Sequence, residues 1–292
     1  MSGAAARRGP RRPGAIGRAL ALGLMHGPAE LLPISSSGHI ELVPWLLRWE
    51  ENLLPATAPT SDAEVRKAFE VALHAGTAAA LLIALRGEVL ESAQSFDLER
   101  AKVVALSFVT PAAVGYLLEK PIERHLGTPG SIAVGLIAGG VLLGWADRSP
   151  QERGHEDAAC ADGFWLGVAQ ACALIPGVSR NGATLTAARL RGFKRADAER
   201  LSRHVALPVI GGATGLKLLR LWRDGLPDGT AVPFFVGAGS SFVSTLASTR
   251  LIGAMERDRS LLPIAGYRIA LGSVVLRRLW RERKRPYDSS HE

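Results

Sequence analysis

Cysteine is almost absent from this sequence: its 292 residues include only Cys160 and Cys172, which do not form a CxxC pair. A zinc site built on paired cysteines is therefore excluded, and cysteine usage says almost nothing about the redox compartment. Aromatic residues are scarce as well, at 6%, and no aromatic-interleaved basic patch suggests nucleic-acid binding. The net charge is +8, but much of it lies at the two arginine-rich ends, as is typical beside anionic lipid headgroups. We expect a lipid bilayer as a partner and no nucleic acid.

Charged side chains are absent or nearly absent from six stretches: 69–85, 103–118, 130–146, 204–221, 229–249 and 261–276. Each stretch is close to the ~20 residues that a helix needs to cross a hydrocarbon core. Helices of soluble proteins carry a polar stripe, with polar residues every three or four positions, and 130–146 has no such stripe. Several stretches are rich in alanine and glycine, which suit close contact between helices in lipid. The sequence therefore predicts membrane-embedded helices.

Two further apolar regions, 14–48 and 163–193, are each interrupted by a polar cluster. In both, a proline precedes a serine by three positions: Pro33 and Ser36, Pro176 and Ser179. Neither arm of either region is long enough to cross the membrane, so each region predicts a re-entrant hairpin. Three spans separate the hairpins, which places them on opposite faces with their tips meeting near the midplane.

The expected fold is an all-α polytopic membrane protein with six transmembrane helices plus two re-entrant helical hairpins in an inverted repeat. We expect a single membrane domain with charged tails, divided as 1–13, 14–280 (repeats 14–146 and 163–276) and 281–292. The apolar stretch 19–25 after the first arginines resembles a signal peptide, but cleavage there would damage the first polar cluster, so we expect it to be retained. The arginine-rich tails favour cytoplasmic termini, whereas the basic residues of 189–203 crowd the opposite face. The orientation stays open.

The first polar cluster begins with Glu30, a lone carboxylate in apolar sequence. It is either a hard oxygen ligand for Mg²⁺ or Ca²⁺, a group that transfers a proton, or an acid satisfied by the amides at a helix start. His26 lies four residues earlier and would share a helical face with Glu30 as a second, tentative metal ligand. Pro28 between them is expected to kink the chain.

A run of hydroxyls, Ser35, Ser36 and Ser37, follows Glu30 and leads to His39. One serine is expected to cap the next helix, but three exceed what capping needs. A helix N-terminus with spare hydroxyls and amides is suited to hold phosphate. Ser36 and His39 are spaced i, i+3, so they form a candidate nucleophile and acid–base pair, although His39 also suits a packed core position.

The second polar cluster holds Arg180 within an apolar region, where a guanidinium needs an anionic partner. Its planar fork suits a phosphate, and snorkelling to headgroups is the alternative. Ser179, Asn181 and Thr184 add donors beside it. Arg268, in the last apolar stretch, is a further intramembrane charge that either pairs with Glu30 or binds a diphosphate. Together the two clusters indicate phosphoryl transfer on a lipid substrate, chemistry that usually uses a divalent ion.

The chain resembles the undecaprenyl-diphosphate phosphatase family of the bacitracin-resistance type. That family carries the motifs E-G-x-x-E-F-L-P-I/V-S-S-S/T-G-H and P-G-x-S-R-S-G-A-T. The corresponding stretches here are HGPAELLPISSSGH over 26–39 and PGVSRNGAT over 176–184. Further similarity lies in KAFEVALHAGT over 67–77 and LPIAGYR over 262–268, so it covers about 15–276.

The resemblance implies a membrane enzyme of the plasma (inner) membrane, multi-pass, which hydrolyses a lipid diphosphate for cell-envelope glycan synthesis. It implies Glu30, Ser36, His39 and Arg180 as catalytic residues, with Mg²⁺ or Ca²⁺ as cofactor. The substrate-binding residues would be Ser35, Ser37, Ser179, Asn181, Thr184 and Arg268. A homodimer is left open. Two positions depart from the family motifs: His26 replaces a glutamate and Asn181 a serine.

Two alternatives use similar residues. A second superfamily of lipid phosphatases has Ser-Gly-His and Ser-Arg fragments, but it requires an H-x-x-x-D after the Ser-Arg, and Ser179-Arg180 is followed here by NGATLT. A polyprenyl-phosphate transporter would use the same inverted-repeat site without hydrolysis. Release of phosphate by the purified protein distinguishes transport from hydrolysis.

Overall fold

The computed structural model describes residues 14–49, 62–88, 90, 97–226, 230–255 and 259–284, so the tail 1–13 and most of the tail 281–292 lie outside the described residues. Within these ranges the regular structure is helical, apart from one isolated bridge between Arg153 and Phe193. The α-helices are α1 (Ala15–Leu31), α2 (Ser36–Leu46), α3 (Asp62–Ala84), α5 (Leu98–Leu126), α6 (Pro129–Ala146), α7 (Cys160–Cys172), α8 (Arg180–Leu190), α9 (Arg195–Asp224), α10 (Ala231–Ala247), α11 (Arg250–Met255) and α12 (Leu262–Arg283). A short 3₁₀-helix, His155–Asp157, precedes α7.

Four helical segments among the described residues are long and apolar enough to cross a membrane: Val65–Ala84, Leu98–Leu118, Pro129–Ala146 and Ala231–Gly253. They coincide with four of the six stretches expected from the sequence. The other two stretches lie in α9 and α12, helices of 30 and 22 residues. Charged side chains at the start of α9 and along α12 lower the hydropathy of these two helices. By length and composition, the chain is a multi-pass membrane protein.

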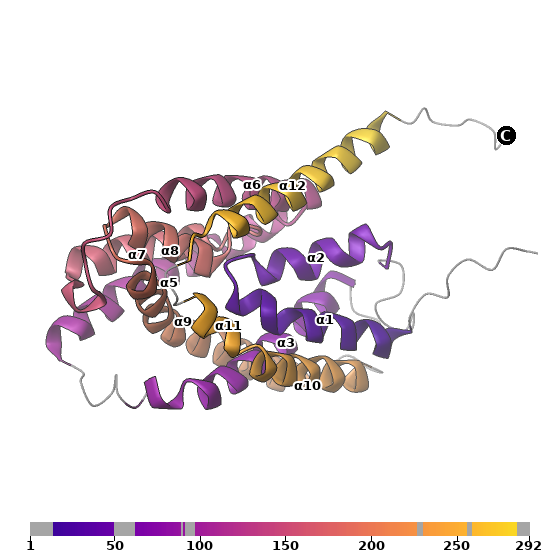
Figure 1. Ribbon diagram of the computed structural model, residues 1–292. Helices are drawn as coiled ribbons and strands as arrows, with labels where there is room; N and C mark the ends of the chain where they lie inside the picture. Colours follow the sequence, from indigo (N-terminus) through magenta and orange to yellow (C-terminus); the bar gives the residue numbers. More distant parts are fainter. Residues whose placement is uncertain are drawn as a thin grey trace, which may run out of the picture.

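The order of helices repeats. Two short helices and three longer ones, α1, α2, α3, α5 and α6, are followed by a similar series, α7, α8, α9, α10 and α12, with the six-residue α11 inserted before α12. Across the halves, α1 packs along α10, α7 packs along α5, and α6 packs along α12 (Figure 1). Corresponding helices therefore exchange equivalent contacts, as a two-fold relation between the halves requires. Buried apolar side chains gather in three clusters, one among α6 to α9, one among α1, α2, α3 and α10, and one among α2, α6 and α12.

Glycines spaced four apart bring α1 against α10. A Cβ atom added to Gly23 would collide with Ser240, and one added to Gly27 would collide with Ser244. The seam between α7 and α5 is built in the same way, because side chains on Gly163 or Gly167 would strike the α5 backbone. Such close approach gains van der Waals contact, which drives helix association in lipid. Each short first helix is therefore held by a glycine face.

A buried carboxylate joins three helices at one end of the bundle. Asp147, just after α6, accepts hydrogen bonds from Arg195 Nε at 2.6 Å, Ser260 Oγ at 2.8 Å and the Leu261 amide at 3.1 Å. Burial alone would raise the pKa of Asp147, but the hydrogen bonds and the charge of Arg195 outweigh it and hold the pKa below its ordinary value. The carboxylate thus ties α6 to the starts of α9 and α12.

The basic segment 189–203 is paired with partners across this end of the molecule. Arg189 is fully buried and donates to the backbone carbonyls of Phe193, Asp147 and Ser149. Three other arginines form ion pairs: Arg191 with Asp162, Arg195 with Asp147 as described above, and Arg203 with Glu88. Because these arginines hold helices together, their presence on this face is not a simple marker of the cytoplasmic side.

Candidate active site at two serine-capped turns

The two polar clusters form matching turns. Ser35 and Ser179 have positive φ angles of 75° and 69°, a region that non-glycine residues seldom occupy. Each caps the following helix: Ser35 Oγ accepts from the Gly38 amide at 3.3 Å, and Ser179 Oγ from the Gly182 amide at 3.2 Å. Ser35 therefore corresponds to Ser179. Counting three positions from the preceding proline would instead match Ser36 with Ser179, which is one residue out of this register.

This register gives the turns different chemistry at the first helical position. Ser36 begins α2, whereas Arg180 begins α8. The next position is Ser37 in one turn and Asn181 in the other, and Gly38 corresponds to Gly182. The strained caps are thus shared by both halves, while one half presents a hydroxyl and the other a guanidinium.

Arg268 of α12 lies between the turns and is fully buried. Its guanidinium donates to the Pro33 carbonyl at 3.3 Å in the first turn, and to the Gly177 and Val178 carbonyls at 3.2 and 2.6 Å in the second. Of the two roles expected for Arg268, the ion pair with Glu30 is not the one found. The side chain instead fixes the spacing of the two turns.

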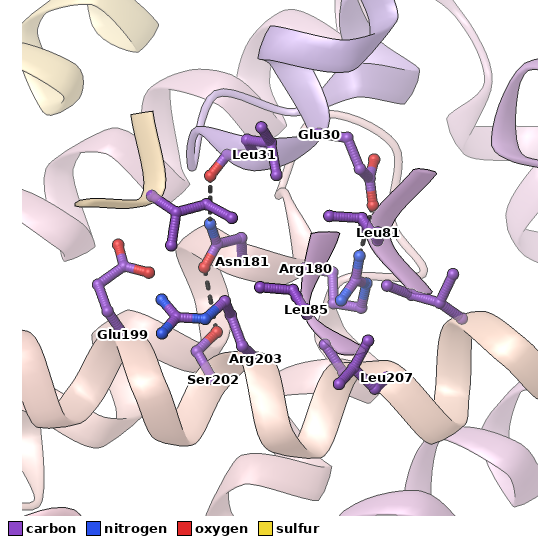
Figure 2. Close-up of a pocket in the computed structure, with 13 residues that line it drawn as sticks. Glu30, Leu31, Leu81, Leu85, Arg180, Asn181, Glu199, Ser202, Arg203 and Leu207 are labelled. Atoms are coloured by element: carbon purple, nitrogen blue, oxygen red, sulfur yellow. Dashed lines mark hydrogen bonds and ion pairs between the residues drawn. The ribbon is translucent and has the colours of Figure 1, made fainter. Parts of the chain in front are cut away.

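Glu30 is the point at which the two halves meet. Its Oε1 atom forms an ion pair with Arg180 Nη2, and its Oε2 atom accepts a hydrogen bond of 2.5 Å from Ser36 Oγ. Figure 2 shows the Glu30 and Arg180 side chains pointing toward each other from α1 and α8. A carboxylate, a hydroxyl and a guanidinium therefore lie in direct contact, although 150 residues separate Glu30 from Arg180.

His39 makes different contacts from those that its spacing predicts. Nδ1 lies 2.7 Å from the Ser35 carbonyl oxygen, and Nε2 lies 2.7 Å from the Tyr267 hydroxyl. A carbonyl oxygen only accepts, so Nδ1 carries the proton, and Nε2 of the neutral ring accepts from Tyr267. The hydroxyl of Ser36 is directed to Glu30, so the expected pairing of Ser36 with His39 is not present. Tyr267 is a partner of His39 that the sequence did not reveal.

A pocket opens beside these groups. Figure 2 shows Glu30 and Arg180 on one side of it and Asn181, Ser202, Arg203 and Glu199 on the other. The remaining walls are largely aliphatic and come from α1, α3, α9 and α11: Leu31, Leu81, Leu85, Ala206, Leu207, Ile210 and Ile252. The pocket therefore combines charged and polar groups with an aliphatic wall.

The chain matches the family described as bacitracin resistance protein BacA over residues 19–274. It belongs to this family. Among its relatives, the protein named undecaprenyl-diphosphatase from Geobacter sulfurreducens is 38% identical over 274 residues, covering 89% of this chain and 97% of the relative. Proteins of the same name from Moorella thermoacetica and Burkholderia mallei are 33% and 32% identical, covering 91% and 89% of this chain and 98% and 94% of theirs. The resemblance seen in the motifs is confirmed.

One departure from the family motif, Asn181, is built into the second turn. Its Nδ2 atom donates to the Leu31 carbonyl at 3.1 Å, and its Oδ1 atom accepts from Ser202 Oγ at 3.0 Å. The fully buried Thr184 donates to the Arg180 carbonyl at 2.9 Å and contacts Ser202 Oγ at 2.5 Å. Asn181 and Thr184 thus brace α8 against α1 and α9, with Ser202 as a partner that the sequence did not reveal.

The other departure, His26, is fully buried in a polar pocket of its own. Nδ1 lies 2.8 Å from Thr77 Oγ1 and 3.2 Å from Ser241 Oγ, which are themselves 2.7 Å apart. α1 continues through Pro28 to Leu31, so His26 and Glu30 stay one turn apart on the same helix. Neither the hydroxyls around His26 nor the nearby imidazole of His74 was anticipated as part of the site.

Proposed function

We propose that this chain is a membrane phosphatase that hydrolyses undecaprenyl diphosphate to the monophosphate. The names of its relatives favour this reaction over transport of the lipid. The observation that carries the proposal is the contact of Glu30 with both Ser36 and Arg180, since Glu30 and Arg180 also line the pocket. The product would return to cell-envelope glycan synthesis, and the activity would confer resistance to bacitracin.

In this proposal Ser36 is the nucleophile and Glu30 its base, because the serine hydroxyl already donates to the carboxylate. Ser36 Oγ attacks the terminal phosphorus, its proton passes to Glu30, and the bond from phosphorus to the bridging oxygen breaks. The lipid monophosphate leaves and takes the proton from Glu30. Water then attacks the phosphoserine and gives a proton to Glu30, and inorganic phosphate is released as the Ser36 oxygen leaves and takes that proton from Glu30.

Arg180 is coupled to this proton transfer through its ion pair. While Glu30 is charged it holds the guanidinium. Protonation of Glu30 removes that attraction, so Arg180 becomes available to the phosphate oxygens as negative charge builds on them. The switch would favour the transition state over the bound substrate.

The remaining predicted site residues divide into contact and positioning groups in this proposal. Ser37, half-buried at the second position of α2, is suited to contact phosphate with the helix amides beside it. Ser35, Ser179, Asn181, Thr184 and Arg268 are committed to protein partners, so we assign them to positioning of the turns. His39, which holds the Ser35 carbonyl and Tyr267, is likewise a positioning residue rather than the base.

The proposed membrane arrangement has six spanning helices, α3, α5, α6, α9, α10 and α12, and two re-entrant hairpins, α1–α2 and α7–α8. Its support is the repeated helix order and the exchanged packing of α1 on α10 and α7 on α5. The serine-capped turns would then meet near the midplane of the plasma membrane. The aliphatic wall of the pocket would accommodate the first part of the lipid chain.

A divalent cation is expected for this chemistry, and Glu30 with His26 would hold it. The donor set is poor for the Mg²⁺ or Ca²⁺ expected from the resemblance, since these hard ions prefer oxygen ligands and His26 offers an imidazole.

The test is release of phosphate from undecaprenyl diphosphate by the purified protein in detergent. Ser36→Ala, Glu30→Gln and Arg180→Lys are each expected to lower kcat by about 100-fold or more, since each removes a group that acts in the transition state. The matched controls, Ser273→Ala, Glu152→Gln and Arg148→Lys, change exposed residues and should retain activity. Normal turnover by Ser36→Ala would refute the serine mechanism, and failure of the wild type to release phosphate would refute hydrolysis.

A further inference from the structure

Three potential metal ligands converge beside the proposed catalytic groups. His26 and Glu30 lie one turn apart on α1, and His74 approaches from α3; one ligand atom from each residue lies within 4.8 Å of the others. The His26 and His74 rings meet edge to face with centroids 4.6 Å apart. The cluster therefore joins the first helix of the hairpin to a neighbouring helix at the base of the active site.

His26 supplies an independent sign that a ligand belongs there. It is fully buried, and its Nε2 atom has no hydrogen-bond partner among the described residues. The opposite nitrogen, Nδ1, is held by Thr77 and Ser241. Metal-binding histidines show this arrangement, in which one nitrogen is fixed by a neighbour and the other is directed at the metal. A buried nitrogen without a partner is costly unless something binds to it.

The donors determine the class of ion. Two imidazoles and one carboxylate are a mixed nitrogen and oxygen set, which suits Zn²⁺, Mn²⁺ and related transition metals better than Mg²⁺ or Ca²⁺. Three protein ligands also leave positions for water or a phosphate oxygen. Glu30 already contacts Arg180 and Ser36, but a carboxylate has about four lone-pair sites and can accept a further partner.

We propose that His26, His74 and Glu30 form a binding site for a divalent transition metal of the Zn²⁺ class, with His74 as the ligand from α3. The role of this ion rests on the proposed function, because the ion would lie next to the groups that receive the phosphate. Binding of the ion, however, is measured without substrate, so the metal-site proposal and the phosphatase proposal can each fail while the other stands.

The test is equilibrium dialysis of the chelator-treated, detergent-purified chain against Zn²⁺, with metal counted by mass spectrometry, and titration with Co²⁺ followed by its visible absorption. We expect one ion per chain and a Co²⁺ spectrum that indicates imidazole ligands. His74→Gln should weaken binding at least tenfold. His125→Gln, which changes an exposed histidine on α5, is the matched control and should bind as the wild type does.

A second variant keeps the test informative if His74→Gln folds poorly. His26→Glu replaces an imidazole with a carboxylate, so it should lower the preference for Zn²⁺ over Mg²⁺ at least tenfold. Absence of Zn²⁺ binding by the wild type, or affinities unchanged in both variants, would overturn the metal proposal even if the enzyme hydrolyses its substrate. Binding without hydrolysis would leave the metal site standing and refute the phosphatase.

Discussion

Arg268 offers the sharpest test of how the two halves are held together. Arg268→Lys keeps the charge but replaces a fork that reaches three carbonyl oxygens with a single ammonium group. The lysine can retain the shortest contact, the one to Val178 at 2.6 Å, and would lose those to Pro33 and Gly177 at 3.3 and 3.2 Å. Hydrogen bonds from charged donors contribute about 1.5–3 kcal/mol each. Because the two lost bonds are long, the low end applies, and we expect a loss of about 3 kcal/mol.

The loss is measured as the free energy of unfolding in mixed micelles, with phosphate release on the same samples. Loss of the hydrogen bonds from residue 268 to the Pro33 and Gly177 carbonyls lets the two turns separate, so the contact of Glu30 with Arg180 loosens. We therefore expect kcat to fall more than tenfold while KM changes little, since misplacement by about 1 Å has such effects. Unchanged stability with a large rise in KM would refute this reasoning and would restore Arg268 as a direct substrate contact.

Three further predictions concern the packing and the polar groups around the site. Gly163→Leu should lower the free energy of unfolding by several kcal/mol, because the new side chain would strike the α5 backbone. Gly239→Leu is the control, since its side chain would enter open space and should leave the stability unchanged. Equal unfolding free energies for the two variants would contradict the close packing of α7 on α5. Asp147 has a lowered pKa, so its stabilising contribution is complete above the ordinary carboxyl pKa and declines as the pH falls below about 4. Thermal unfolding of Asp147→Asn across pH should therefore converge with that of the wild type at low pH, and a constant difference would count against this linkage. Tyr267→Phe removes the donor to His39 Nε2 and should lower kcat modestly without moving its pH profile, because Glu30 and not His39 carries the proton; a shifted profile would place His39 in the proton chemistry.

The membrane helices and the family could be read from the sequence because they depend on local composition and on contiguous motifs. The charge-free stretches coincide with four apolar helices, and the segments 26–39 and 176–184 identify the family. Hydropathy was less informative for α9 and α12, since both contain charged residues, some of which, such as Arg203 and Arg268, are held by partners in the fold. Composition records a charge but not the group that neutralises it.

The contacts of the site depend on the tertiary structure. Sequence spacing paired Ser36 with His39 because both lie on one helix, yet the hydroxyl is directed to Glu30 across the turn and His39 to Tyr267. Ser35 has a positive φ angle, which sets the direction of the first residues of α2. The spacing of residues along the sequence does not reveal this backbone angle.

What the sequence determined by itself is therefore the set of reactive residues, their placement in two polar clusters and the apolar helices that carry them. Only the folded chain decided which cluster residues act together. Arg268 holds the two turns at one distance through backbone carbonyls, which carry no signature in the sequence. The imidazole of His74 reaches His26 and Glu30 because α3 packs near α1, a contact between helices that depends on the whole bundle.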